Sequence, residues 1–285
     1  WNTASPIRGG QASFVKLHDT LTSHPKPRLE RATPMKRFRV FLTCLGRETA
    51  KFPGATAPLG ILYLAAYLRE RFNADIRLLD QRAENCSLED VARRAIEFNA
   101  DVVGVTVLTS YAYMLPELTE AIRKRLPRAL ILLGGPYATS FGRASLENAD
   151  ADAAVVGEGE RSFEAIISAW LTGSDFADIP GLIWRDKSGE VVSNPGAFPS
   201  IEDLDSLPFP AYDLIDVAKY WRSFSSCNLP PCRYVSLFSS RGCPMKCIFC
   251  HNVFGKRFRA HSAERVVAEI KYFSKKFNLD YIEFL

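Results

Sequence analysis

The sequence predicts an α/β fold in which a doubly wound, mostly parallel sheet is followed by the start of a second strand–helix unit. Three observations predict it. Strand-like and helix-like segments alternate from residue 38 onward. Residues 102–108 form an apolar run broken only by Thr106, as in a strand buried on both faces of a parallel sheet. Several predicted strands end in glycine, where a chain turns tightly into the next element.

Size and composition fit a globular protein of about two domains. The chain has 285 residues, and 47% of them are apolar. It contains no apolar run of the ~18 residues that a membrane span needs, so we expect no membrane span. The seven cysteines are an odd number and follow no secretory signal. That pattern favours reduced thiols in the cytoplasm over a disulfide framework.

The net charge of +4 is concentrated at the amino-terminal end. Residues 1–37 hold seven basic side chains against two acidic ones. The rest of the chain has no basic field, so we expect no nucleic-acid partner. The same residues are rich in Pro, Ser, Thr and Arg, which predicts a disordered or non-native N-terminal extension. Met35 directly precedes the first predicted strand, and one hypothesis is that it is the true start; a transit peptide is the alternative.

Residues 38–175 are predicted to form the first domain. Predicted strands cover residues 39–43, 76–79, 102–108, 130–133 and 153–156, and predicted helices cover residues 59–72 and 88–98 and two later segments around Leu118 and Phe163. The helix over 59–72 is apolar nearly all round, which predicts burial on every side. Ser87 and Asp90 predict a capping box at the start of the next helix.

Ligands of doubly wound sheets bind beyond the carboxyl ends of the strands. The loops expected there are 45–58, 109–113, 134–140 and 157–160, and three of them contain glycine. Neither a GxGxxG fingerprint after the first strand nor a Walker A sequence is present, so a nucleotide site is poorly supported.

Residues 176–230 are predicted to form a hairpin and a linker, and residues 231–285 the truncated start of a second domain. In the linker, Tyr212, Tyr220 and Trp221 are interpreted as packing residues rather than substrate contacts. Later in the chain Ser262 predicts a helix start, and residues 280–285 predict a further strand. The basic residues Lys256, Arg257 and Arg259 are interpreted as a solvated loop.

Cys243, Cys247 and Cys250 form a CxxxCxxC run. A 4Fe–4S cluster is normally held by four thiolates, so three would leave one iron open to another ligand. Zinc sites more often use CxxC pairs with a second pair or with histidines, and Cys227 and Cys232 fit no common zinc spacing. The run therefore predicts a 4Fe–4S cluster.

The cysteine run resembles the cluster loop of the radical S-adenosylmethionine (SAM) enzymes. Arg241-Gly242 before the first cysteine and Phe249 before the third match the pattern of that family. The resemblance implies that Cys243, Cys247 and Cys250 hold the cluster and that the open iron binds SAM. It further implies that an electron from the cluster cleaves SAM to a deoxyadenosyl radical, with Phe249 near the adenine.

Residues 38–172 are similar to the cobalamin-binding domain that precedes many radical SAM domains. The likeness is carried by APLGILYLAA at 57–66, DVVGVT at 101–106, GGPYAT at 134–139 and VGEGE at 156–160. It implies a flavodoxin-like doubly wound parallel sheet, which is a Rossmann-like cobalamin-binding domain, followed by the start of a radical SAM partial TIM barrel.

The same resemblance implies a set of cobalamin contacts. Thr106, Leu108 and Thr109 would line the pocket of the benzimidazole tail, Gly134 and Gly135 would let the backbone approach the nucleotide loop, and Gly157 and Glu158 would lie by the corrin edge with Pro58, Leu59 and Gly60. Tight turning is the alternative reason for the glycines. Residues 45–60 contain no histidine, so this loop offers no histidine ligand to cobalt.

In function, the resemblance implies a cobalamin-dependent radical SAM enzyme that most often transfers a methyl group to an unactivated carbon of a small molecule. A cyclase or oxidoreductase of the anaerobic tetrapyrrole ring-forming type is one alternative, and a non-catalytic cobalamin-binding module is another. The implied partners are a small-molecule substrate and an electron donor such as flavodoxin or ferredoxin. Because a radical SAM barrel has more strand–helix units than follow the cysteines, we expect an amino-terminal fragment that is inactive by itself.

Overall fold

The structure, a computed structural model, describes residues 37–47, 56–197, 200–222, 224–225, 230–248, 250 and 253–285. All of these residues belong to one compact unit. The predicted N-terminal extension, apart from its last residue, lies outside the described residues, and so does Phe249.

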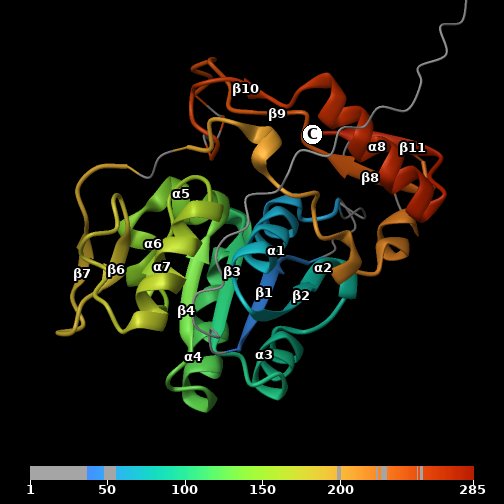
Figure 1. Cartoon of the computed structure of the whole chain (residues 1–285). Helices are drawn as coiled ribbons and strands as arrows, with labels where there is room; N and C mark the ends of the chain where they lie inside the picture. The colour runs from blue at the N-terminus through green and yellow to red at the C-terminus, as the bar shows by residue number, and fades with distance from the viewer. Residues whose placement is uncertain are drawn as a thin grey trace, which may run out of the picture. The chain divides into compact units, whose positions relative to one another are not determined.

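A seven-stranded sheet forms the first part of the fold (Figure 1). Its strands are β1 (Phe38–Leu45), β2 (Ala74–Asp80), β3 (Val102–Val107), β4 (Leu130–Gly134), β5 (Ala153–Ala154), β6 (Ile183–Arg185) and β7 (Val191–Ser193). The first five are parallel and stand in the order β2-β1-β3-β4-β5. This order is the flavodoxin-like one, so the predicted doubly wound sheet is confirmed.

The hairpin formed by β6 and β7 continues this sheet. It pairs antiparallel with β5 through Ala153 opposite Trp184 and Ala154 opposite Ile183. The sequence placed this hairpin in the linker, but it covers a strand of only two residues whose open edge would leave backbone groups unpaired. The sheet therefore extends past residue 175.

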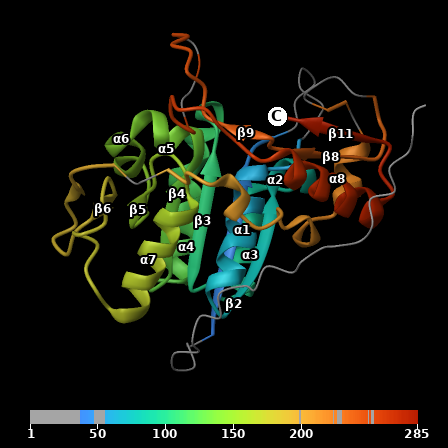
Figure 2. The ribbon, with the colours of Figure 1, turned by 45° about the horizontal axis from the view of Figure 1, so that its top comes forward.

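Helices cover both faces of the sheet (Figure 2). One face carries α3 (Leu88–Glu97), α4 (Leu115–Arg125), α5 (Gly135–Phe141) and α6 (Arg143–Glu147), and the other carries α1 (Leu59–Arg71) and α7 (Glu160–Thr172). The short elements α2 (Gln81–Glu84) and η1 (Thr109–Met114) follow β2 and β3. The predicted capping box of Ser87 and Asp90 is confirmed at the start of α3.

Helix α1 is buried on both sides, as its sequence predicts. Ile61 and Leu64 pack against the sheet in one hydrophobic core. Leu62 and Tyr63, on its other side, pack in a second core together with Tyr234. One helix therefore belongs to two cores, and it joins the sheet to the second part of the chain.

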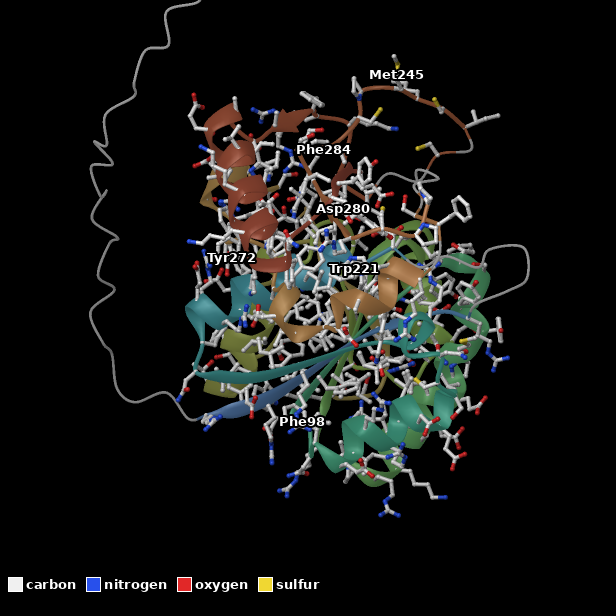
Figure 3. The ribbon with its side chains drawn as sticks, turned by 90° about the vertical axis from the view of Figure 1, so that its right-hand side faces the viewer. Phe98, Trp221, Met245, Tyr272, Asp280 and Phe284 are labelled. Carbon is white, nitrogen blue, oxygen red and sulfur yellow. The ribbon has the colours of Figure 1, made fainter. Side chains whose placement is uncertain are left out.

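The second part begins with a parallel strand pair. Its elements are β8 (Tyr234–Leu237), β9 (Ser240–Arg241), β10 (Arg259–Ala260), α8 (Ala263–Phe277) and β11 (Tyr281–Phe284). β8 and β11 are parallel neighbours connected through α8, so the predicted strand–helix–strand unit is confirmed. Ser262 caps α8 by accepting a hydrogen bond from the Arg265 amide at 3.1 Å. Figure 3 shows Phe284 of β11 and Tyr272 of α8 in the same part of the molecule.

The linker packs between these two parts through η2 (Leu204–Ser206), η3 (Tyr212–Leu214) and η4 (Val217–Arg222). Tyr212 donates to the Ser236 carbonyl at 2.7 Å, and Trp221 donates to the Tyr234 carbonyl at 2.7 Å. Tyr220 donates to the buried Asp80 at 3.0 Å. The three aromatic residues are therefore packing residues, as predicted. Within the described ranges no helix has both the length and the apolar character that crossing a bilayer requires.

The tight packing at the centre of β3 can be tested by adding one methyl group at Gly104. A Cβ on Gly104 would lie 2.7 Å from Leu42 Cδ2 and 3.2 Å from Phe163 Cε1. Because both neighbours are buried, we expect Gly104→Ala to lower the free energy of unfolding by about 1–3 kcal/mol in urea denaturation. Gly134→Ala on the adjacent strand is the control, since nothing lies within 4 Å of its Cβ. Equal stability of the two variants would contradict the packing described.

Candidate functional site: a cavity beneath the cysteine loop

A cavity of about 290 Å³ lies at the carboxyl ends of the parallel strands. Cys44 of β1, Thr106 of β3 and Gly134 of β4 contribute to its floor, together with Val155 just after β5. The first turns of α1 and α7 form its sides. The chain reverses its direction of winding between β1 and β3, which is where ligands of such sheets bind.

Nine of the ten residues that the resemblance assigned to cobalamin line this single cavity. They are Pro58, Leu59, Gly60, Thr106, Leu108, Gly134, Gly135, Gly157 and Glu158. The tenth, Thr109, is not part of the lining and begins η1. Motifs from four separate loops are thus brought together at one place.

The glycines of the cavity are of two kinds. Gly135 and Gly157 have φ values of +80° and +85°, and a Cβ on Gly135 would lie 2.0 Å from Thr106 Oγ1, so their own backbone requires glycine. Gly60 and Gly134 lie outside that region of φ, and nothing lies within 4 Å of a Cβ built on either. Because both line the cavity, a side chain there would occupy space that is open to a ligand.

Most of the lining is uncharged. Burial, reinforced by the nearby Asp80 carboxylate, raises the pKa of the Cys44 thiol far above its usual range. Cys44 is therefore a neutral thiol at neutral pH. The charged side chains of the lining are Glu158, Glu160 and Arg241, which lie close to one another.

The roof of the cavity comes from the second part of the chain. Phe238 and Arg241 precede the cysteine loop, and Val253 and Phe254 follow it. Phe238 stacks on Tyr63 of α1 with ring centroids 6.0 Å apart and meets Phe254 edge-on at 5.3 Å. Sequence reasoning missed these residues as cavity residues; the available signal was that they flank the CxxxCxxC run on both sides.

Four buried charged side chains connect the β5–α7 loop to β9 and β10, and we call Glu158, Glu160, Arg241 and Arg259 the charge clamp. Arg241 Nη2 donates to Glu160 Oε1 at 2.7 Å, and Arg241 Nη1 lies 3.5 Å from Glu158 Oε2. Arg259 donates to Glu158 Oε1. The four side chains are between 1% and 8% exposed. The prediction that Arg259 lies in a solvated loop is therefore wrong, because the ion pair draws it inward.

The surroundings keep Arg241 charged. Burial lowers the pKa of this guanidinium, but the carboxylates of Glu160 and Glu158 outweigh that effect and raise it. The guanidinium carbon also lies 5.3 Å from the ring centroid of Tyr63 and 5.1 Å from that of Phe254, where cation–π attraction operates. Glu158 lines the cavity, but its carboxylate is paired with the two arginines.

The cysteine loop is closed at its neck by backbone contacts. Gly242 has a φ of +84°, and a Cβ there would lie 2.0 Å from the Arg257 carbonyl oxygen. The Cys243 amide donates to the Gly255 carbonyl at 3.2 Å. These contacts explain why an Arg-Gly-Cys sequence opens the loop, since only glycine fits at the second position.

The side chains of Cys243, Cys247 and Cys250 are exposed. Met245, at the far end of the loop, is exposed as well (Figure 3). In the part of the chain that the structure describes, no three Cys, His, Asp or Glu side chains converge as the ligands of a metal ion do. The loop thus offers three accessible thiols, a donor set that suits an iron–sulfur cluster chemically, without gathering them around one point.

Comparisons with known proteins agree on the first part of the chain. The B12 binding domain family matches residues 49–167. An uncharacterized methyltransferase of Pyrococcus horikoshii is 32% identical over 257 residues, which are 88% of this chain and 54% of the relative. An anaerobic magnesium-protoporphyrin IX monomethyl ester cyclase of Cereibacter sphaeroides is 29% identical over 228 residues, 78% of this chain and 36% of the relative. The chain spans about half, or less, of the length of these relatives.

A solved structure extends the likeness to the second part. The cobalamin-dependent S-adenosylmethionine radical enzyme OxsB, with aqua-cobalamin and S-adenosylmethionine bound, has a similar fold with a TM-score of 0.69 at 20% identity. The match covers 88% of this chain and 34% of OxsB, so it reaches beyond the B12-binding domain. From the domain match and the relatives, we conclude that this chain carries a B12-binding domain, and its fold over both parts is similar to that of OxsB.

Proposed function

We propose that this chain is the cofactor-carrying part of an enzyme that transfers a methyl group to an unactivated carbon of a small molecule. The observation that carries the proposal is the construction of the cavity roof from residues on both sides of the cysteine loop. A cobalamin site and a cluster loop would then face each other, as radical-dependent methyl transfer requires. The name of the Pyrococcus relative, a methyltransferase, supports methyl transfer as the reaction.

The cavity suits the base-bearing tail of cobalamin. Its volume of about 290 Å³ is at the lower end of small-molecule pockets, which range over roughly 300–1,000 Å³. Apolar walls and bare backbone at Gly60 and Gly134 would accept a flat aromatic base. We propose the nine lining residues of the predicted set as cobalamin contacts, with Thr106 as the hydroxyl among them, and we leave out Thr109.

For the second cofactor we propose Cys243, Cys247 and Cys250 as ligands of a 4Fe–4S cluster, with Phe249 near a bound SAM. When bound, the cluster supplies the electron that cleaves SAM, and cobalamin carries the methyl group. The chain's own residues position the cysteine loop. Lys256 Nζ donates to the Met245 carbonyl at 2.7 Å and so ties the far end of the loop to the segment that leads back to β10.

A cyclase reaction is the second candidate, because a ring-forming cyclase is among the relatives. Product mass distinguishes the two: gain of one methyl group supports methyl transfer, and loss of hydrogens without a methyl group supports cyclisation. A non-catalytic cobalamin carrier is the third candidate and would bind no cluster.

As partners we propose a small-molecule substrate and a reductant such as flavodoxin or ferredoxin. A reducing compartment, the cytoplasm, would keep the exposed thiols able to bind iron.

The cluster assignment is tested by anaerobic reconstitution with iron and sulfide. We expect the chain to give the paramagnetic resonance signal of a reduced 4Fe–4S cluster, and Cys247→Ser to lose it because one thiolate ligand is removed. Cys86→Ser is the control, since Cys86 is half-buried beside α3 and lies outside the loop. Tightly held zinc in the wild type, or a full signal from Cys247→Ser, would disprove the assignment.

The cobalamin assignment is tested at Gly60. Alanine at this first-turn position of α1 is expected to raise the free energy of unfolding by up to about 1 kcal/mol, because it is the better helix former. If the bare backbone contacts cobalamin, the same variant will bind aqua-cobalamin at least about tenfold more weakly, a loss of ~1.4 kcal/mol, in equilibrium dialysis.

Ser168→Ala, at an exposed position of α7, is the matched control for a helix-stabilising change away from the cavity. It is expected to leave cobalamin affinity unchanged. Unaltered affinity in Gly60→Ala would remove Gly60 from the contact set.

A further inference from the structure

We propose that the charge clamp couples the two cofactor sites energetically. Cobalamin in the cavity favours cluster assembly on the cysteine loop, and the assembled cluster tightens cobalamin binding by the same factor, because thermodynamic coupling is reciprocal. The inference rests on the proposed function and adds to it a role for Glu158, Glu160, Arg241 and Arg259 as positioning residues.

The first observation is the electrostatics of the loop neck. Arg241 and Arg259 stand directly opposite each other in the β9–β10 pair. Like charges in that relation repel, and burial strengthens the repulsion. Glu158 contacts both guanidiniums, one with each of its carboxylate oxygens. The Glu158 carboxylate therefore offsets the repulsion between the two guanidiniums and stabilises the neck of the loop.

The second observation is where the two carboxylates come from. Glu158 lies in the β5–α7 loop and Glu160 is the first residue of α7, and both line the cavity. Glu160 also suits the positive end of the α7 dipole, which favours its place there. A ligand that fixes this wall of the cavity fixes both carboxylates, and with them the neck of the cysteine loop.

The third observation is the short path from the clamp to the first cysteine. Gly242 alone separates Arg241 from Cys243, and it packs against the Arg257 carbonyl with no room for a side chain. The Cys243 amide donates a hydrogen bond to the Gly255 carbonyl, in the segment that leads back to β10. A displacement of the clamp therefore moves the first predicted cluster ligand directly.

The clamp is poorly explained as a device for stability. Arg241 Nε and Arg259 Nε are buried and find no hydrogen-bond partner among the residues the structure describes. Unpaired buried donors cost free energy, and a buried ion pair often contributes no more than apolar side chains of the same size. Because the charge clamp lies between the cavity and the cysteine loop, we infer that it positions these two sites relative to each other.

The primary experiment measures the affinity of the 285-residue chain for aqua-cobalamin under anaerobic conditions, with the cluster assembled and with the cluster absent. We expect binding to be about tenfold tighter when the cluster is present, within the usual range of allosteric coupling. Equal affinity in the two states would overturn the coupling and leave the proposed function intact. Failure to bind cobalamin at all, or to form a cluster at all, would overturn both.

Two variants locate the coupling in the clamp. Glu160→Gln removes one carboxylate charge from Arg241, and we expect the affinity ratio between cluster-bound and cluster-free chain to fall below about twofold. Glu202→Gln is the matched control: Glu202 pairs with Arg257 at 2.6 Å at the same neck, but the side chains are 55% and 75% exposed. The control is expected to keep the full ratio.

A double variant covers the case in which Glu160→Gln does not fold. Glu160→Leu combined with Arg241→Met replaces the ion pair by apolar side chains and leaves Glu158 paired with Arg259. Such replacements are generally tolerated. We expect a folded chain, judged by circular dichroism, that binds each cofactor separately with the coupling lost. An undiminished ratio in this variant, or in Glu160→Gln, would overturn the role of the clamp.

Discussion

The arrangement of this molecule depends on two carboxylates and two guanidiniums that are buried together where the start of α7 meets the β9–β10 pair. Each of these charges is costly to remove from water, and the cost is offset by the ion pairs among them and by hydrogen bonds of Arg259 and Glu158 to the backbone of Ile201 and Phe254. The set therefore permits little variation in how the β5–α7 loop meets β9 and β10. That restriction fixes the floor of the cavity, which belongs to the sheet, relative to its roof, which belongs to the cysteine loop.

Apolar contacts support the same junction from the other side. Tyr63 of α1 stacks on Phe238, and its hydroxyl donates to Glu269 of α8 at 3.1 Å. Burial raises the pKa of the Glu269 carboxyl, although Arg265 opposes the shift. The junction thus combines aromatic packing, one hydroxyl–carboxyl contact and the charge clamp, and together these contacts hold the roof over the cavity.

Local patterns in the sequence predicted most of the sheet. The apolar run of residues 102–108 became the central strand β3, and Ser87 with Asp90 became the capping box of α3. The strand and the capping box both depend on residues that are close together in the chain, so their patterns can be seen in the sequence. The attachment of the β6–β7 hairpin to β5 was missed because it depends on an edge that only the folded sheet creates. Arg259 was misread for the same reason, since its carboxylate partner lies far away in the chain.

The candidate site was predicted to a comparable degree and with a similar limit. Motif matching found the cavity floor through residues such as Thr106 and Gly134, because strand ends of a parallel sheet share one edge. It missed Phe254 and Val253 in the roof, because their place beside the CxxxCxxC run does not by itself show that this segment reaches a distant sheet. For the cysteines, spacing predicts the kind of donor set, whereas their convergence depends on the group they bind.

The double burial of α1 has a consequence for how such proteins can be taken apart. A B12-binding domain cut off after β7 would keep the packing of Ile61 and Leu64 but would leave Leu62 and Tyr63 without the residues that cover them. The excised domain would expose an apolar patch on α1 where the linker and β8 pack in the intact chain, and such a patch favours aggregation. Grafting this domain onto another enzyme would therefore require transplanting those covering segments with it, so the boundary of the exchangeable unit does not coincide with the edge of the sheet.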